Sequence, residues 1–157
     1  MNEARRRQFL KKPRVAVLSF LARDGSPVAT PIWYEYRDGK FYVHTSEETF
    51  KARCIRRDPR VSLCIQDEEP PYSFVAVRGK AKAVQEPDPA ELDKRMAYHY
   101  LGRIGGNYYL REIAPQYGGR PVTLEIEPER AQEVDGSAEV ALPMRVLGRL
   151  TRRMPGL

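Results

Sequence analysis

Cysteine and histidine are scarce in this 157-residue chain, which contains only Cys54, Cys64, His44 and His99 of these two types. The two cysteines are isolated, so they exclude both a disulfide-stapled scaffold and a cysteine-based metal site. Two histidines without a recognisable set of carboxylate partners also argue against a metal centre. We therefore expect no bound metal, and we expect both thiols to behave as small buried apolar residues in a reducing compartment, the cytoplasm.

Long apolar segments are also missing. No stretch approaches the about 20 apolar residues that a membrane-spanning helix needs, and no apolar run follows the basic start as it would in a secretory signal. The net charge is +6, but residues 1–14 hold six basic side chains and one acidic one, and residues 143–157 hold four basic side chains and no acidic one. The body between them therefore carries −3. We predict no transmembrane segment and no nucleic-acid partner.

Recognisable catalytic and nucleotide-binding motifs are absent as well. The chain has no P-loop, no G-x-G-x-x-G after a strand, no G-x-S-x-G and no H-E-x-x-H. His44 lies beside Tyr42 in an expected strand, and no nucleophile stands near it in the sequence. We interpret it as a half-buried or rim histidine rather than a catalytic acid or base. No catalytic residue is therefore assigned.

What the chain does have is the length and balance of one globular domain, with 41% hydrophobic and 31% charged residues. Six segments of strand character are separated by turn residues, and they cover residues 14–22, 28–36, 41–45, 61–66, 74–84 and 122–126. The first is apolar on both faces, which predicts a strand buried on both sides. The dipeptide Asp38-Gly39 predicts a tight hairpin between the second and third segments.

Two helices have clear start signals. Residues 45–48 (TSEE) fit a capping box and predict a helix through Arg57, which the following Asp-Pro ends. Residues 88–91 (DPAE) begin a second helix, in which an apolar stripe recurs at helical spacing at Leu92, Met96 and Tyr100. A further helical turn is expected over residues 107–113, after a break at the two glycines 105 and 106.

Short strands joined by hairpins, with helices confined to the connections, predict a mainly β fold: an antiparallel, six-stranded barrel, closed or partly closed. We divide the chain into a basic N-terminal helix or arm (1–13), the barrel domain (14–135), and a linker with a basic amphipathic tail (136–157). We expect the tail to dock on the barrel or on a second copy. Contact with a membrane surface is the alternative.

The junction between the third strand and the first helix is rich in hydroxyls and cations. The hydroxyls of Thr45, Ser46 and Thr49, the ammonium of Lys51 and the backbone N–H groups of a helix start are suited to holding one phosphate. The alternative is that Thr45 only caps the helix and that the basic residues of this segment form a solvated face. Residue chemistry alone leaves both interpretations open.

Four stretches of the chain resemble the pyridoxamine 5′-phosphate oxidase-like family of flavin-binding split barrels. The resemblance is strongest to the branch of reductases that use the deazaflavin coenzyme F420. The stretches are residues 28–34 (VATPIWY), 38–45 (DGKFYVHT), 49–63 (TFKARCIRRDPRVSL) and 77–81 (VRGKA). The resemblance implies the split-barrel fold, a homodimer, and a cofactor site at the dimer interface.

The resemblance also implies two groups of cofactor-binding residues. The group that borders the tricyclic ring comprises Thr30, Pro31, Ile32 and Trp33, although Trp33 is equally suited to core or dimer packing. The group that binds the phosphate comprises Thr45, Thr49 and Lys51, with help from Arg53 and Arg56. Cys54 stands where many members of the family have asparagine, which removes one expected hydrogen bond to the cofactor.

The implied activity is hydride transfer from coenzyme F420, or alternatively FMN, to a small organic acceptor. In such an enzyme the cofactor supplies the hydride and the protein supplies position and electrostatics, which accounts for the missing acid–base motif. The deazaflavin's acidic tail would need further cations, which the arginines at 53, 56, 57 and 60 are placed to supply. Tyr72, Phe74 and the tyrosine-rich segment 98–117 are candidate pocket walls.

Two alternatives accompany this expectation. The chain lacks the arginine and histidine signature that true pyridoxamine phosphate oxidases carry near their C-terminus, so vitamin B6 oxidation is not expected. A non-enzymatic flavin-binding or cofactor-carrying split barrel is the second hypothesis.

Overall fold

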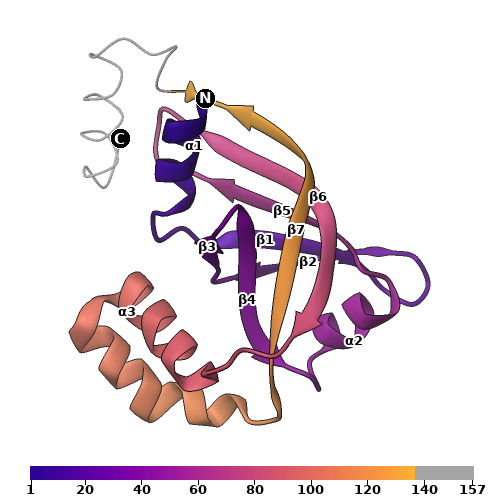
Figure 1. Cartoon of the computed structure of the whole chain (residues 1–157), viewed down its shortest axis with the longest axis vertical. Helices are drawn as coiled ribbons and strands as arrows, with labels where there is room; N and C mark the ends of the chain where they lie inside the picture. Colours follow the sequence, from indigo (N-terminus) through magenta and orange to yellow (C-terminus); the bar gives the residue numbers. More distant parts are fainter. Residues whose placement is uncertain (137–157) are drawn as a thin grey trace, which may run out of the picture.

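A computed structural model describes residues 1–136 of the chain (Figure 1). The strands are β1 (Ala16–Leu21), β2 (Pro27–Ile32), β3 (Glu35–Arg37), β4 (Lys40–Ser46), β5 (Arg60–Gln66), β6 (Phe74–Val84) and β7 (Pro121–Val134). The helices are α1 (Glu3–Leu10), α2 (Phe50–Arg57) and α3 (Pro89–Tyr108), followed by a π-helical turn η1 (Tyr109–Ile113) and a 3-10 helix η2 (Ala114–Tyr117). The predicted tail beyond residue 136 lies outside the described residues.

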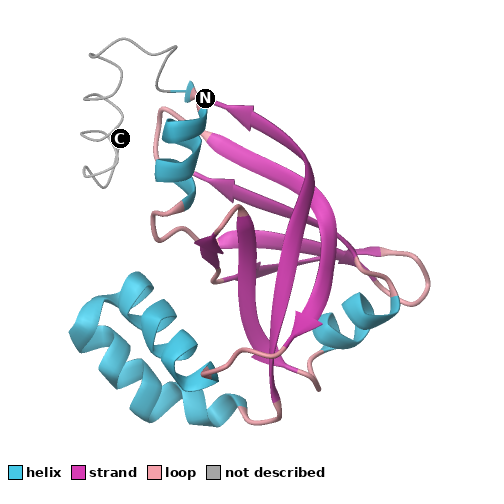
Figure 2. Cartoon of the chain, viewed as in Figure 1, coloured by secondary structure: helices cyan, strands magenta, loops and turns pink. Residues whose placement is uncertain are grey.

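All seven strands form one antiparallel sheet in the order β2-β1-β5-β6-β7-β4-β3, with helices at its flanks (Figure 2). The two edge strands, β2 and β3, are separated in the chain only by Trp33 and Tyr34. Three Cα–Cα steps span at most about 11 Å, so the sheet curls until its two edges come close together. The predicted mainly β split barrel is confirmed.

Residues 1–136 contain seven strands rather than the predicted six. The difference arises in the expected strand 28–36, which breaks at Trp33 and Tyr34 because the chain leaves one edge of the sheet there and joins the other. The last strand is also longer than expected, since β7 pairs with β6 through Val134. Its second half is mostly exposed and polar, so it lacks the apolar alternation that marks a strand.

The core is built from the inner faces of the strands and from α2. The burial pattern of β5 alternates strictly, as expected for a strand with one face in the core. Fully buried side chains include Leu18, Phe41, Val43, Ile55, Leu63, Ile65, Val75 and Ile126. Except for Ile55 of α2, these side chains come from strands distant in sequence, and their shared core holds the curled sheet together.

The outer face of β1 differs from the expectation of a strand buried on both sides. Leu18 is fully buried, whereas Val15 and Val17 are 44% and 39% exposed. Val17 lies opposite Pro31 on β2 and Cys64 on β5. Cys64 is only partly buried, also contrary to expectation. The second apolar face of β1 is therefore a surface that the described residues do not cover.

The helix boundaries confirm part of the sequence interpretation. Helix α2 ends at Arg57 as predicted, with Asp58 as its C-cap, but it begins after Thr49, whose side chain caps it. Residues 45–46 extend β4 instead, because their pairing with β7 continues to Ser46. Helix α3 begins after its cap Asp88 as predicted, and its kink lies at Gly102 (φ +67°) rather than at the two later glycines.

Two flanking elements frame the functional region. Figure 1 shows α3 and the turns after it as a helical arm beside β4 and the start of β7. Helix α1 lies at the far end of β7, where the amino group of Met1 forms an ion pair with Glu133 at 3.1 Å. Within residues 1–136, none of the helices combines the length and apolar composition needed to span a lipid bilayer.

Candidate functional site

A groove of about 740 Å³ lies between the curled sheet and the helical arm. Its walls come from the β2–β3 connection, the end of β4, the start of α2, the inner side of α3 and the segment from η1 to β7. This volume lies in the range of sites that hold drug-sized ligands and cofactors. We refer to this feature as the groove.

Most of the residues that the sequence predicts for a cofactor line the groove together. They are Pro31, Ile32, Trp33, Thr45, Thr49 and Lys51. Thr30 does not line it. Arg53 and Arg56 do not line it either, and both are exposed on α2. The arrangement thus joins two predicted groups that lie in different parts of the chain, and the role of each residue stays a prediction.

One end of the groove is built by the junction of β4 and α2. The Thr49 hydroxyl donates to the Ser46 carbonyl at 2.7 Å and accepts from the Ala52 N–H at 3.3 Å, so its single proton is used. Thr45 Oγ1 lies 3.3 Å from Thr49 Oγ1. Thr49 therefore holds the helix start, and Thr45 is the donor in its contact with Thr49. A ligand in the groove receives the Thr45 proton only when this hydroxyl turns away from Thr49.

Lys51 is the cation of this end. Burial lowers the pKa of its ammonium group, and no carboxylate among the described residues contributes an opposing shift. A half-buried ammonium loses solvation without gaining a partner charge, which is unfavourable unless an anion binds beside it. The Thr45 hydroxyl and the Lys51 ammonium are thus suited to an anionic group such as a phosphate.

The loop before β7 closes the same end, and the sequence interpretation missed it. Gly119 has φ +107°, and a Cβ at this position would lie 2.3 Å from Ser46 Oγ and 2.6 Å from Glu48 Oε2. The Glu48 carboxylate accepts hydrogen bonds from the Ser46 hydroxyl and, at 3.0 Å, from the Arg120 N–H. Two adjacent glycines immediately before a strand were the available signal, because close backbone approach often requires glycine.

The neighbouring carboxylate explains the position of one predicted arginine. Glu47 forms ion pairs with Arg120 at 2.7 Å and with Arg56 at 3.5 Å. Arg56 therefore neutralises Glu47 instead of lining the groove. Two further arginines of this segment are also engaged, since Arg57 donates to the Leu21 carbonyl at 2.9 Å and Arg60 pairs with Asp58 at 2.6 Å.

Another part of the groove wall is aromatic. Trp33 stacks on Tyr100 of α3, and it also contacts Tyr109 at a ring-centroid distance of 5.1 Å. The Trp33 ring thus packs on α3 and also lines the groove, and its contact with a cofactor ring stays a prediction. Tyr109 and Tyr117 line the groove as well, whereas Tyr72 and Phe74 lie at a separate surface depression.

An ionisable pair occupies a further part of the groove wall. His44 Nε2 lies 3.4 Å from Asp93 Oδ1, and His44 Nδ1 lies 3.5 Å from the hydroxyl of buried Thr123. The His44 side chain is 15% exposed, and burial raises the pKa of Asp93 although His44 opposes the shift. The sequence interpretation of a half-buried histidine fits this geometry, but it contained no signal for Asp93, which lies far along the chain on α3.

The donor set of the groove is not that of a metal centre. Throughout the described part of the chain, no group of three or more histidine, cysteine, aspartate or glutamate side chains is placed to hold a metal ion. The groove instead combines the Lys51 ammonium and threonine hydroxyls with aromatic and apolar side chains. This pattern matches a ligand that carries a planar ring and a phosphate.

Comparisons with known proteins agree with this geometry. A protein described as a conserved hypothetical protein of Mycobacterium tuberculosis has 26% sequence identity and a TM-score of 0.69, and the match covers 90% of this chain and 89% of that one. A protein titled F420 reductase is 21% identical, with a TM-score of 0.66 and coverage of 80% and 94%. An FAD-binding protein of Mesorhizobium loti is 21% identical, with a TM-score of 0.62 and coverage of 85% and 92%.

The comparison with curated proteins gave no match. The two structures at 21% identity share the fold with this chain. The sequence profile described as "Pyridoxamine 5′-phosphate oxidase" matches residues 3–135, which include every strand of the sheet and all walls of the groove. The chain therefore belongs to the pyridoxamine 5′-phosphate oxidase family.

Proposed function

We propose that this protein is an oxidoreductase that binds a flavin or deazaflavin in the groove. The single observation that carries the proposal is Lys51, a half-buried ammonium without a carboxylate partner among the described residues, on the wall of a groove that aromatic side chains also line. In this proposal Thr45 and Lys51 bind the phosphate, and Thr49 holds the helix start beside it. Pro31, Ile32 and Trp33 border the ring.

Coenzyme F420 is the cofactor we propose first, with hydride transfer to a small organic acceptor. The sequence resemblance to the F420-dependent branch and the fold shared with a protein titled F420 reductase support it. FMN is the second candidate, and a specific observation favours it. Three of the four arginines considered for an acidic cofactor tail are engaged with Glu47, Leu21 and Asp58, so fewer free cations stand beside Lys51 than that tail would use.

In this proposal the chain's own residues position the reactants and supply one proton to the acceptor. When bound, the cofactor supplies the hydride. Trp33 is held by its stack on Tyr100, so the ring-binding wall is rigid before any ligand arrives. His44 Nε2 and Asp93 Oδ1 lie 3.4 Å apart on the groove wall. In this proposal the pair supplies the proton that an acceptor needs when it takes up a hydride.

The proposal includes a homodimer. Val15 and Val17 on the outer face of β1 are large, apolar and more than a third exposed, and Val15 and Pro31 also line the groove. A second copy that covers this face would therefore also complete one wall of the groove. We expect light scattering to give a dimer mass for the wild type and a smaller mass for Val17→Lys.

A titration of the purified protein with FMN and with coenzyme F420 tests the cofactor proposal. Loss of one charge-assisted hydrogen bond costs about 1.5–3 kcal/mol, so we expect Lys51→Ala to weaken binding by roughly 10- to 150-fold. Arg53→Ala is the matched control, because Arg53 lies on the same helix but outside the groove. Failure of both cofactors to bind below about 1 mM, an affinity of only about 4 kcal/mol, would refute the proposal.

A second measurement separates the enzyme from a cofactor carrier. The reduced cofactor that binds best is incubated with the protein and a panel of quinones, nitroaromatic compounds and enones, and its oxidation is followed by absorbance. Acceleration over the protein-free rate supports an oxidoreductase. Tight binding without acceleration for any acceptor would instead support a non-enzymatic carrier.

A further inference from the structure

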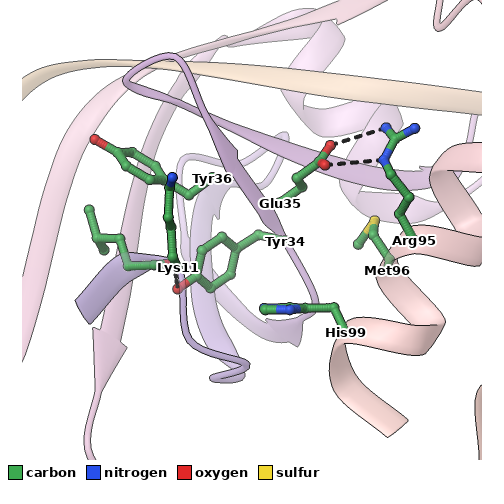
Figure 3. A pocket seen from close by; sticks show the side chains of 8 residues that line it. Lys11, Tyr34, Glu35, Tyr36, Arg95, Met96 and His99 are labelled. Carbon is green, nitrogen blue, oxygen red and sulfur yellow. Dashed lines mark hydrogen bonds and ion pairs between the residues drawn. The ribbon is translucent and has the colours of Figure 1, made fainter. Parts of the chain in front are cut away.

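We propose that a second cavity binds a small organic monocarboxylate. This cavity has a volume of about 280 Å³ and lies between the end of α1, the start of β3 and α3 (Figure 3). Of its lining residues, only Met96 is shared with the groove. The proposal concerns a separate site and does not depend on the cofactor.

The walls of the cavity are largely aromatic and apolar. Tyr34 and Tyr36 lie along one side and Leu10 and Met96 complete the apolar lining. In Figure 3 the Tyr34 ring lies at the centre, between Lys11 on one side and His99 on the other. The Tyr34 hydroxyl donates to the Leu10 carbonyl at 3.0 Å, so this polar atom is already satisfied. The wall is therefore suited to the apolar body of a ligand.

Two charged residues that line the cavity, Glu35 and Arg95, belong to a group of four that neutralise one another. Arg95 pairs with Glu35 at 3.3 Å and with Glu86 at 4.0 Å, and Arg37 lies 3.6 Å from each of the same two carboxylates. Two arginines and two glutamates thus form a closed set without net charge. They leave no excess negative charge to hold a further cation.

Lys11 adds one positive charge to the cavity wall that the neutral set of ion pairs does not compensate. It lines the cavity, and no acidic side chain among residues 1–136 pairs with it. His99 also lines the cavity, and its ring makes an edge contact with Tyr100 at 5.3 Å, which leaves its ring nitrogens without a protein hydrogen bond in the described part of the chain. The unpaired Lys11 ammonium beside an apolar wall favours a carboxylate, whereas His99 lies on the other side of the Tyr34 ring (Figure 3).

The size and charge of the cavity narrow the ligand class. A volume of about 280 Å³ is at the lower limit for small-molecule sites, so the ligand is small. One surplus ammonium compensates one negative charge, and the neutral set of ion pairs beside it offers no further free cation for a second. A monocarboxylate with a flat apolar body therefore fits better than a dianionic phosphate.

The test uses the full chain, with benzoate as the probe and benzyl alcohol as a neutral analogue of the same shape. Binding is followed by calorimetry and by saturation-transfer NMR for the wild type, Lys11→Ala and Lys12→Ala. Lys12 is the matched control, because it is the next residue and does not line the cavity. We expect saturable benzoate binding that Lys11→Ala weakens by about fivefold or more. Lys12→Ala and the wild type should bind alike, and benzyl alcohol more weakly.

One further variant separates this cavity from the groove. Lys51→Ala changes the groove and should leave benzoate binding unchanged. Absence of saturable benzoate binding, equal loss in the two lysine variants at 11 and 12, or loss in Lys51→Ala would each overturn the proposal. Thermal unfolding of each variant shows whether a loss of binding is a loss of folding.

Discussion

Trp33 stacks on Tyr100 with ring centroids 4.8 Å apart and an interplanar angle of 9°. Trp33 belongs to the two-residue link between the edge strands, and Tyr100 belongs to α3. The Tyr100 hydroxyl donates to the Arg14 carbonyl at 2.9 Å and accepts from the Tyr34 N–H at 3.1 Å. One tyrosine thus ties the helical arm to the place where the barrel closes and to the wall of the groove.

Removal of this hydroxyl is expected to destabilise the fold. Tyr100→Phe keeps the stacked ring but leaves the Arg14 carbonyl and the Tyr34 N–H without their partner, which costs about 1–3 kcal/mol of the free energy of unfolding. Urea denaturation measures the loss. Tyr98→Phe is the control, since the Tyr98 hydroxyl bonds to exposed Asn107 at 2.6 Å. Equal losses in the two variants would show that the partly buried hydroxyl has no special role.

The cap of α2 gives a second prediction. The Thr49 side chain accepts from the Ala52 N–H, and loss of such a cap costs about 1 kcal/mol of stability. We expect Thr49→Ala to lower the free energy of unfolding by that amount, which a lower urea midpoint would show, and Thr49→Ser to retain the wild-type midpoint. If Thr49→Ser is as unstable as Thr49→Ala, the methyl group rather than the hydroxyl is what matters.

The close approach at Gly119 gives a third prediction. Gly39→Ala places a side chain at φ +78° with nothing within 4 Å, so it carries only a conformational cost of about 1–2 kcal/mol. Gly119→Ala has the same kind of conformational cost, and its Cβ also clashes with Ser46 and Glu48 and breaks their hydrogen bond. We therefore expect it to lower the free energy of unfolding by about 1 kcal/mol more than Gly39→Ala does.

Thermal unfolding compares these two glycine variants. If Gly119→Ala is no less stable than Gly39→Ala, the loop does not press on the β4–α2 junction. In addition, a cofactor titration of Gly119→Ala should show weaker binding, since Ser46 lines the groove.

The fourth prediction concerns pH. Burial raises the pKa of Asp93 above 3.8 in the folded state, so the stability it provides is full below about pH 3.8 and is lost as the pH rises through the folded-state pKa. Asp93→Asn removes this ionisation. The stability of the variant relative to the wild type should therefore increase with pH across that window and then level off.

A residue with the opposite shift is the control for this pH series. The hydrogen bond from Arg60 lowers the pKa of Asp58 to about 2. The stability that Asp58 provides is present above its unfolded-state pKa and is lost as the pH falls through about 2. Asp58→Asn should thus lose stability relative to the wild type as the pH rises. Urea unfolding at a series of pH values measures both variants, and the same trend in both would contradict the assignment for Asp93.

Local patterns in the sequence were sufficient to predict much of the fold. Alternating apolar residues identified the regions of the strands, and Asp88-Pro89 marked the start of α3, because these signals act within a few residues. Boundaries that depend on long-range pairing were wrong. Thr45 looked like a helix cap, but strand pairing with Val122 keeps it in β4, and the cap is Thr49.

The amino-acid sequence by itself determined the mainly β class, the hairpin at Asp38-Gly39 and the chemistry of the Thr45–Lys51 segment, since each depends on neighbouring residues. Only the tertiary structure decided which cations face the groove. Lys51 lines it, while Arg56 turns to Glu47, because the competing carboxylates and the approach of Gly119 come from side-chain packing and from segments far along the chain. The meeting of Asp93 with His44 has the same origin, since it exists only once α3 packs against the curled sheet.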